Sequence, residues 1–210
     1  MKLSNILLAS STLSISLAQN FQSSAKRGLV FVNNPKSPDD NKIWPPPKSD
    51  LTWYYNYKVA PSGIYSGVSQ SDFEFVPMLW SPTTTFKDEI QMLFDQGMNI
   101  THVLGYNEPD GEAKTGGSGV SPSVAAANWI AQMEPLRQRG IKLGGPAVTG
   151  SPRGHKWLAD FFSACRDLGS NCTIDFLPVH WYGNFEGFAS HLGEVVASYV
   201  LPPSAGISLT

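Results

Sequence analysis

The sequence of 210 residues predicts an α/β fold with parallel strands. Apolar runs rich in β-branched and aromatic residues recur along the chain, and they are continuous rather than alternating, which is typical of strands buried on both faces. Beyond residue 83 these runs alternate with helical patterns at a spacing of about 30 residues, which indicates repeated β-α-β units. Polar and aromatic side chains follow the runs, and their placement bears on which α/β architecture forms.

The apolar runs predict six strands, and the segments between and after the later runs predict four helices. Threonine cap candidates open the first helix and Gly97 ends it, while Ser121-Pro122 opens the second and Gly140 stops it. The third helix has apolar residues at a spacing of three to four. The expected strands are residues 27–34, 51–58, 73–80, 101–107, 141–149 and 173–183, and the expected helices are 83–97, 121–139, 155–169 and 186–200.

An open doubly wound sheet and a (β/α)8 barrel of the TIM type both fit this alternation. In the barrel, functional side chains gather at the carboxyl ends of the strands. No glycine-rich phosphate motif follows the first strand, which disfavours a nucleotide-binding doubly wound sheet. We therefore expect the TIM-barrel type, with about six of its eight strands present in this chain. The residues that favour the barrel, because they end expected strands, are Asn33, Asn34, Asn56, Tyr57, Trp80, Asn107, Glu108, His180, Trp181 and Tyr182.

The amino terminus predicts a secretory signal peptide. A lysine precedes an apolar stretch, residues 3–17, and Ser16-Leu17-Ala18 fits the small residues before a cleavage site. A hydrophobic first helix of a cytosolic protein is the alternative. We expect a signal peptide at 1–18, an unstructured lead at 19–26 and one domain at 27–210, incomplete at its carboxyl end. The protein would then be extracellular.

Secretion determines how the two cysteines are interpreted. Cys165 and Cys172 flank Gly-Ser-Asn, so in an oxidising compartment we expect them to form a disulfide that closes a small loop. No second Cys or His pair lies nearby, so we expect no metal site and no cofactor. Asn-x-Thr sequons occur at Asn99 and Asn171. Asn99 precedes a buried strand at a surface corner and is the better acceptor.

The composition argues against a nucleic-acid or membrane-surface protein. The net charge is −2, charged residues make up 15% of the chain, and no long run has one sign. No segment beyond the leader is apolar enough to span a bilayer, and we expect a monomer. Aromatic residues make up 11%, which suits either a large aromatic core or stacking against uncharged sugar rings.

Glu108 is the candidate catalytic acid. It follows the expected strand 101–107, where the mouth of a barrel would partly desolvate its carboxyl group and let it hold a proton for donation. Cleavage of a glycosidic bond needs such an acid on the leaving oxygen. Asn107 beside it can hydrogen-bond a sugar hydroxyl. The alternative is an ordinary Asn-Glu-Pro-Asp turn in which Asp110 caps a loop.

A second polar cluster ends the expected strand 173–183. His180 and Tyr182 are two residues apart, so in a strand they point to the same side and could both line a pocket, while Trp181 points away. A buried structural histidine is an equally good interpretation of His180. Trp53 and Trp80 are candidate stacking platforms for sugar rings or else core residues, and Asn56 is a further candidate binding residue.

Four spaced motifs together resemble the fungal cell-wall glycosyl hydrolases of glycoside hydrolase family 128, the alkali-sensitive-linkage-protein-like family. The resemblance extends from about residue 27 to about residue 199. It implies a (β/α) barrel of the retaining, two-glutamate clan that acts on β-1,3-glucan. In that comparison Glu108 matches the general acid/base, and His180 and Tyr182 match pocket residues. The motifs are VLGYNEPD, SPSVAAANWIAQMEPLRQRGIKLGGPAVT, WLADFFSAC and CTIDFLPVHWYG.

The resemblance also implies a second glutamate, the nucleophile, at the end of a seventh strand within a Thr-Glu-Phe-like pattern. No such pattern follows Tyr199, and Glu186 and Glu194 lie after the sixth strand, where neither replaces it. We therefore expect a secreted β-1,3-glucan hydrolase of the fungal cell wall whose nucleophile is absent from this chain. A non-catalytic glucan-binding or structural wall protein is the alternative, and an unrelated secreted α/β protein is a third.

Overall fold

The structure is a computed structural model that describes residues 24–200. The expected signal peptide at 1–18, residues 19–23 and residues 201–210 lie outside this part of the chain. The first strand, β1 (Ser24–Val30), begins three residues before the range expected for it. Residues 24–26 of the expected unstructured lead are therefore part of a strand, which corrects that boundary.

The strands are parallel, and neighbours in space are neighbours in sequence. A three-stranded sheet has the order β1, β2 (Leu51–Tyr55), β3 (Glu74–Phe75), and a second pairing joins β4 (His102–Val103) to β5 (Lys142–Leu143). A parallel bridge between Met78 and Leu104 continues the order from β3 to β4. The α/β class with parallel strands is thus confirmed, and among the strands of residues 24–200 the order does not reverse as it does in a doubly wound sheet.

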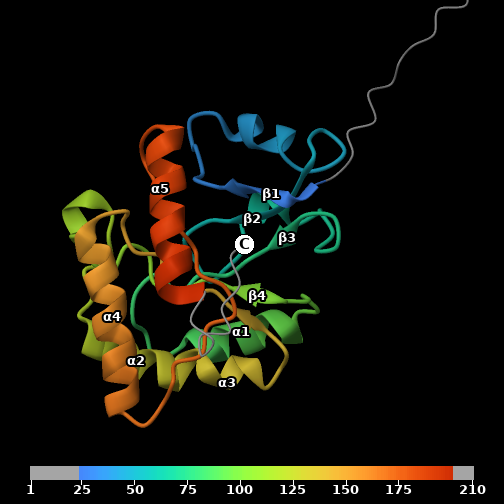
Figure 1. Cartoon of the computed structure of the whole chain (residues 1–210). Helices are drawn as coiled ribbons and strands as arrows, with labels where there is room; N and C mark the ends of the chain where they lie inside the picture. The colour runs from blue at the N-terminus through green and yellow to red at the C-terminus, as the bar shows by residue number, and fades with distance from the viewer. Residues whose placement is uncertain (1–23, 201–210) are drawn as a thin grey trace, which may run out of the picture.

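The helices cover the strands on the side away from β1 and along one flank (Figure 1). The second expected helix is divided at Met133, because Pro135 has no backbone N–H to continue the helical hydrogen bonds. The helices are α1 (Phe86–Asp95), α2 (Pro122–Gln132), α3 (Glu134–Arg137), α4 (Pro152–Asp167) and α5 (Phe185–Val195), with 3-10 turns η1 (Pro38–Ile43), η2 (Gly63–Tyr65) and η3 (Ala113–Thr115) and a π turn η4 (Val196–Val200).

The sixth expected strand, residues 173–183, does not form as a strand. Its contact with β5 is a single parallel bridge between Gly144 and Phe176, with Gly145 N–H donating to the Phe176 carbonyl at 2.8 Å. The side chain of Asp175 accepts the Leu143 N–H at 2.9 Å, which replaces one bond of a regular ladder. Pro178 offers no N–H. The segment therefore lies in the sixth position beside β5, but the expectation of six regular strands was wrong.

The core lies between the strands and helices α1, α2 and α4. Trp129 of α2 is fully buried, and its ring meets the edges of Tyr106 and Phe161 at centroid distances of 6.2 and 5.8 Å. Gly105 makes room for this ring, because a Cβ there would lie 2.9 Å from the Trp129 indole. Burial of such large aromatic groups is a main stabilising term of the fold.

The disulfide Cys165–Cys172 fastens the end of α4 to the start of the sixth segment. The two Cα atoms are 5.7 Å apart, and both cysteines are fully buried. Asn99 is exposed, as a glycan acceptor must be, and its use stays a prediction.

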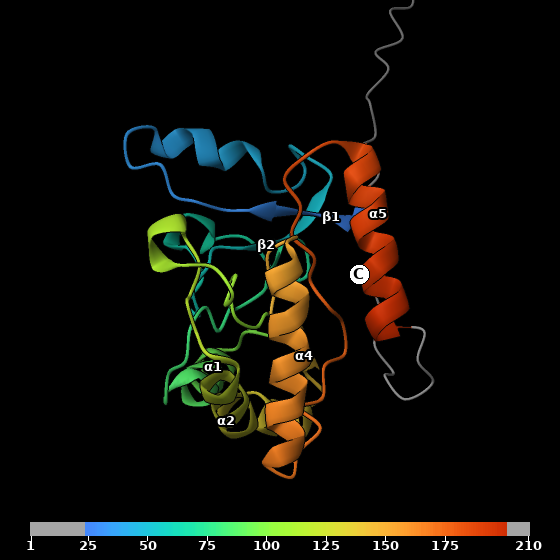
Figure 2. The same ribbon diagram turned by 60° about the vertical axis from the view of Figure 1, so that its left-hand side comes forward.

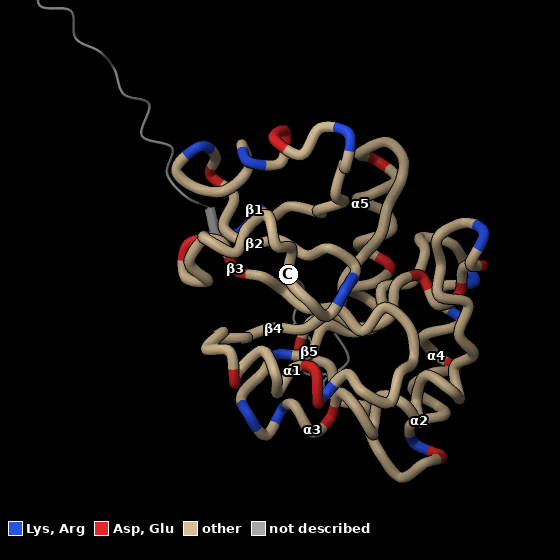
Figure 3. Tube along the Cα trace, turned by 180° about the vertical axis from the view of Figure 1, so that it is seen from behind, with Lys and Arg blue, Asp and Glu red and all other residues tan. Residues whose placement is uncertain are grey.

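Charged residues of both signs occur along the described part of the chain. Basic and acidic residues are interspersed along the trace (Figure 3). Within residues 24–200, none of the helices has both the length and the apolarity needed to cross a bilayer.

A partly buried carboxylate at the amino ends of the strands makes stability depend on pH. Glu74 of β3 accepts a hydrogen bond from Thr101, and its Oε1 lies 3.3 Å from His102 Nδ1. Burial acts to raise the pKa of Glu74, but the hydrogen bonds and the charge of His102 outweigh it, so the pKa lies below the ordinary 4.5. The unfolded chain therefore binds a proton at a higher pH than the folded one does.

We expect Glu74→Gln to lower the melting temperature at pH 7. The stabilisation by the ionised carboxylate is complete above the ordinary pKa and is lost as the pH falls through the lowered one, so the difference from wild type should shrink below about pH 4.5. Thermal melts from pH 3 to 8 measure this, with the exposed Glu112→Gln as control. A difference that does not change with pH would contradict this account.

Candidate active site

The backbone of Asn107 and Glu108 is fixed between the ends of two neighbouring strands. The Asn107 N–H donates to the Trp80 carbonyl at 3.2 Å on one side, and the Glu108 N–H donates to the Ala147 carbonyl at 2.7 Å on the other. A parallel bridge pairs Asn107 with Ala147. Glu108 adopts a left-handed backbone conformation, φ 39°, which costs a residue with a side chain about 1–3 kcal/mol and is most often found at functional sites.

Glu108 and His180 meet across the strand ends, although 72 positions separate them in sequence. His180 Nδ1 lies 2.9 Å from Glu108 Oε1, and the two side chains are 18% and 14% exposed. This pair is half desolvated but open enough to reach a ligand. The histidine can hold one oxygen of the carboxyl group and leave the other free, so it orients the group for proton transfer.

The loop after Glu108 is folded tightly onto itself and onto the residues that follow β5. The Gly111 N–H donates to the Glu108 carbonyl at 2.8 Å, and the Asn107 amide donates to the Gly116 carbonyl at 2.9 Å. The carboxylate of Asp110 accepts the Thr149 N–H at 2.8 Å and the Thr149 hydroxyl. Asp110 thus stabilises the loop, as the alternative interpretation of this motif predicts. The Glu108 side chain instead contacts His180.

The predicted binding residues have different surroundings. Asn107 is 5% exposed, and its Oδ1 is buried without a hydrogen-bond partner. Asn56 uses its side chain to close its own loop, donating to the Ala60 carbonyl and accepting the Lys58 N–H. Trp80 lines a surface hollow of about 380 Å³ between the ends of β2 and β3 and the start of α1.

The other two predicted aromatic residues differ in exposure. The half-buried Trp53 stacks on Tyr55 at 6.4 Å and covers Gly28, where a Cβ would meet its ring at 2.1 Å. Tyr182 is 86% exposed, so its ring is not part of the core. Trp53 therefore packs on β1, and Tyr182 is free to contact a ligand.

Sequence reasoning passed over Tyr55 and kept Tyr57 only as a strand-end residue. Burial raises the pKa of Tyr55, and its ring lies 5.1 Å from that of Tyr57. Tyr57 also lines the hollow beside Trp80. The signal was available, because Trp53, Tyr55 and Tyr57 alternate along one face of the expected strand.

The tight loop offers a test of how Glu108 is held. A Cβ on Gly117 would lie 2.6 Å from the Glu108 carbonyl oxygen and from the backbone of Gly111, so the loop would have to shift. We expect Gly117→Ala to lower the free energy of unfolding by about 1–3 kcal/mol. Gly63→Ala, with nothing within 4 Å of the added methyl group, is the control and should change stability by under about 0.5 kcal/mol. Urea titration measures the free energy of unfolding of both variants, and equal values would contradict this interpretation of the loop.

Comparison with known proteins places this geometry in a family. The chain is 33% identical over 183 residues to alkali-sensitive linkage protein 1 of Schizosaccharomyces pombe, covering 85% of this chain and 30% of that protein. The chain thus spans less than a third of the length of this curated relative.

Solved structures agree with the sequence match. A GH128 subgroup III curdlan-specific exo-β-1,3-glucanase of Blastomyces gilchristii, in complex with glucose, matches with TM-score 0.64 and 31% identity over 81% of this chain and 68% of that one. A GH128 subgroup I endo-β-1,3-glucanase of Amycolatopsis mediterranei, in complex with laminaritriose, matches with TM-score 0.55 and 31% identity over 76% and 61%. The family model of the glycosyl hydrolase catalytic core matches residues 28–203, and the chain belongs to that family.

Proposed function

We propose that this chain is the catalytic core of a secreted β-1,3-glucan hydrolase of the fungal cell wall, with Glu108 as its general acid/base. The observation that supports this most is the contact between Glu108 and His180, which meet across the strand ends although β5 lies between their two segments. The GH128 relatives described as β-1,3-glucanases support the substrate class. The proposed fold is the (β/α)8 barrel, of which the described residues contribute the first five strands and the segment beside β5.

In this proposal Glu108 donates a proton to the leaving glycosidic oxygen. His180 is a positioning residue, because it holds one carboxyl oxygen of Glu108 at 2.9 Å and does not itself touch the bond. The exposed Tyr182 and the hollow beside Trp80 supply the contacts to sugar rings. Asn107 presents a buried Oδ1 without a partner and could accept a sugar hydroxyl if its side chain turns toward the pocket. The protein acts as a monomer on a polysaccharide or oligosaccharide chain.

A retaining mechanism also needs a nucleophilic carboxylate about 5–5.5 Å from the acid. Within residues 24–200 the recorded side-chain partner of Glu108 is His180, and the carboxylate nearest in sequence, Asp110, is held by Thr149. We propose that the nucleophile is the seventh-strand glutamate that the family resemblance implies. The same observation favours a second candidate function, a wall protein that binds glucan at this site without cleaving it.

Reducing-sugar release from linear β-1,3-glucan is the primary test. Where the chain cleaves glucan, we expect Glu108→Gln to lower the rate by about 10²–10⁴, the usual contribution of a general acid. Glu112→Gln, an exposed carboxylate of the same loop, is the matched control and should retain the wild-type rate. Glucan pull-down of all three proteins is measured beside it.

Each outcome separates the candidate functions. Cleavage that is lost only in Glu108→Gln supports the hydrolase and requires a nucleophile within this chain. Glucan binding without cleavage, in a folded protein, supports the wall-binding function. A folded protein that neither binds nor cleaves glucan overturns both.

An α-glycosyl fluoride tests Glu108 independently of the nucleophile. In such a donor the C–F bond breaks as the 3-hydroxyl of a glucan acceptor attacks C1, fluoride leaves, and the hydroxyl proton passes to Glu108 as the base. We expect the chain to form β-1,3-linked products from α-laminaribiosyl fluoride, and Glu108→Gln to form at least about 10² times less. Equal product from both proteins, measured by fluoride release and chromatography, would refute the role of Glu108.

A further inference from the structure

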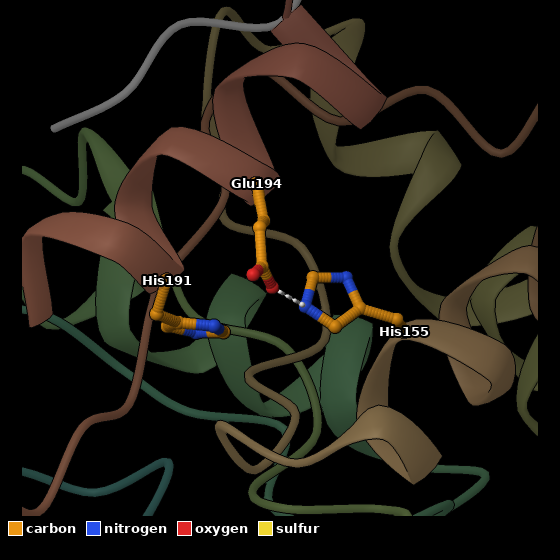
Figure 4. Close-up of side chains that lie close together, drawn as sticks. All are labelled: His155, His191 and Glu194. Atoms are coloured by element: carbon orange, nitrogen blue, oxygen red, sulfur yellow. Dashed lines mark ion pairs between the residues drawn. The ribbon is translucent and has the colours of Figure 1, made fainter. Parts of the chain in front are cut away.

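Three potential metal ligands lie together between α4 and α5, away from the proposed catalytic pair. His155 comes from the first turn of α4, and His191 and Glu194 come from α5. Figure 4 shows the three side chains directed at one another, and Figure 2 shows the two helices side by side. We call these three residues the histidine cluster.

The spacing of the cluster suits a shared ligand. His191 and Glu194 are three residues apart on α5, so they lie on one face of that helix. One ligand atom from each of the three residues lies within 4.8 Å of the others. The sequence of the expected helix 186–200 places only His191 and Glu194 on one face, and His155, at the start of the expected helix 155–169, joins them in the folded chain.

The histidine cluster has an unsatisfied polar atom. His155 Nε2 is buried and has no hydrogen-bond partner, since its distance of 3.7 Å from Glu194 Oε2 is too long for a hydrogen bond. A buried polar atom without a partner is costly and calls for an explanation such as a bound ion. His191 is 5% exposed, and Glu194, 64% exposed, gives solvent access to the cluster.

Aromatic rings fix the orientation of both imidazoles. Tyr199 stacks on His155 with an interplanar angle of 7°, and its hydroxyl donates to the His155 carbonyl at 3.1 Å. Trp181 stacks on His191 at 5.4 Å with an angle of 24°. Such supporting contacts hold ligand side chains in place before the metal arrives.

The chemistry of the three groups selects the class of cation. Two imidazoles and a carboxylate suit zinc and its first-row neighbours, whereas magnesium and calcium prefer oxygen ligands. Tetrahedral zinc would bring ligand atoms to roughly 3.3 Å from one another, which needs only small side-chain rotations from the present spacing.

We propose that His155, His191 and Glu194 bind one divalent cation of the zinc class, with water as the fourth ligand, and that this ion clips α5 to α4. The role is structural, because the three ligands join two helices. The competing explanation is a metal-free ion pair between protonated His155 and Glu194.

Zinc titration of the metal-stripped chain tests the proposal. We expect saturable binding of one Zn²⁺ by calorimetry, a higher melting temperature with Zn²⁺ than with Mg²⁺, and visible absorption bands of tetrahedral Co²⁺. Glu194→Gln and His191→Gln should each weaken binding by at least about tenfold and remove the thermal shift. Glu194 is exposed, so its variant should fold even if His191→Gln does not.

Two controls locate the ion. Glu186→Gln changes another exposed glutamate of α5 and should bind zinc as wild type does. His180→Asn removes the His–Glu pair of the proposed catalytic site and should also leave Zn²⁺ affinity unchanged, whereas loss of binding in this variant alone would place the ion at Glu108 instead. The proposal is overturned by that result, by an absence of saturable binding, or by equal affinity in Glu194→Gln and wild type.

Discussion

The site depends on the close parallel contact between the segments 103–108 and 143–147. Gly144 N–H donates to the Val103 carbonyl at 2.8 Å, and Ala147 N–H donates to the Tyr106 carbonyl at 2.9 Å. Glycine at 105 and 144 is required, because a Cβ at either position would lie under 3.0 Å from an aromatic ring on the neighbouring element. With the strands locked in this register, the carboxyl end of one presents Glu108 beside the next. The position of the acid is therefore set by backbone bonds and aromatic packing and not by its own side chain.

The order of elements could be predicted from the sequence, whereas the lengths of the strands could not. Continuous apolar runs correctly indicated parallel strands, and caps such as Ser121-Pro122 and Gly97 placed the helices to within a few residues. The regular strand pairing is much shorter than the apolar runs: β3, β4 and β5 each have two residues. At the sixth segment, Asp175 and Pro178 interrupt the ladder with side-chain chemistry that hydrophobic periodicity does not measure.

The polar residues at the strand ends correctly indicated where the candidate site lies, but they did not indicate the role of each residue. Glu108 and His180 do meet there, although β5 lies between their two segments and the pairing of adjacent strands does not predict this contact. Asp110 and Asn56, from the same kind of position, instead hold their loops. Asn56 finds its backbone partners two and four residues away, whereas Asp110 is held by Thr149, 39 positions further along the chain. A single sequence does not reveal which polar residue will be left free.

The segment 180–184 links the proposed catalytic pair to the histidine cluster. His180 contacts Glu108, and the next residue, Trp181, packs on His191 and on Gly187, where a Cβ would meet its ring at 2.4 Å. The Trp181 indole N–H donates to the Asn184 carbonyl at 3.0 Å, so the turn before α5 is rigid around this ring. Any shift of α5 therefore moves Trp181 and, through one peptide unit, His180. A contact that fixes α5 against α4 would therefore also fix the orientation of the Glu108 carboxyl group. In this way the contact between the two helices would affect the proposed catalytic site without touching it.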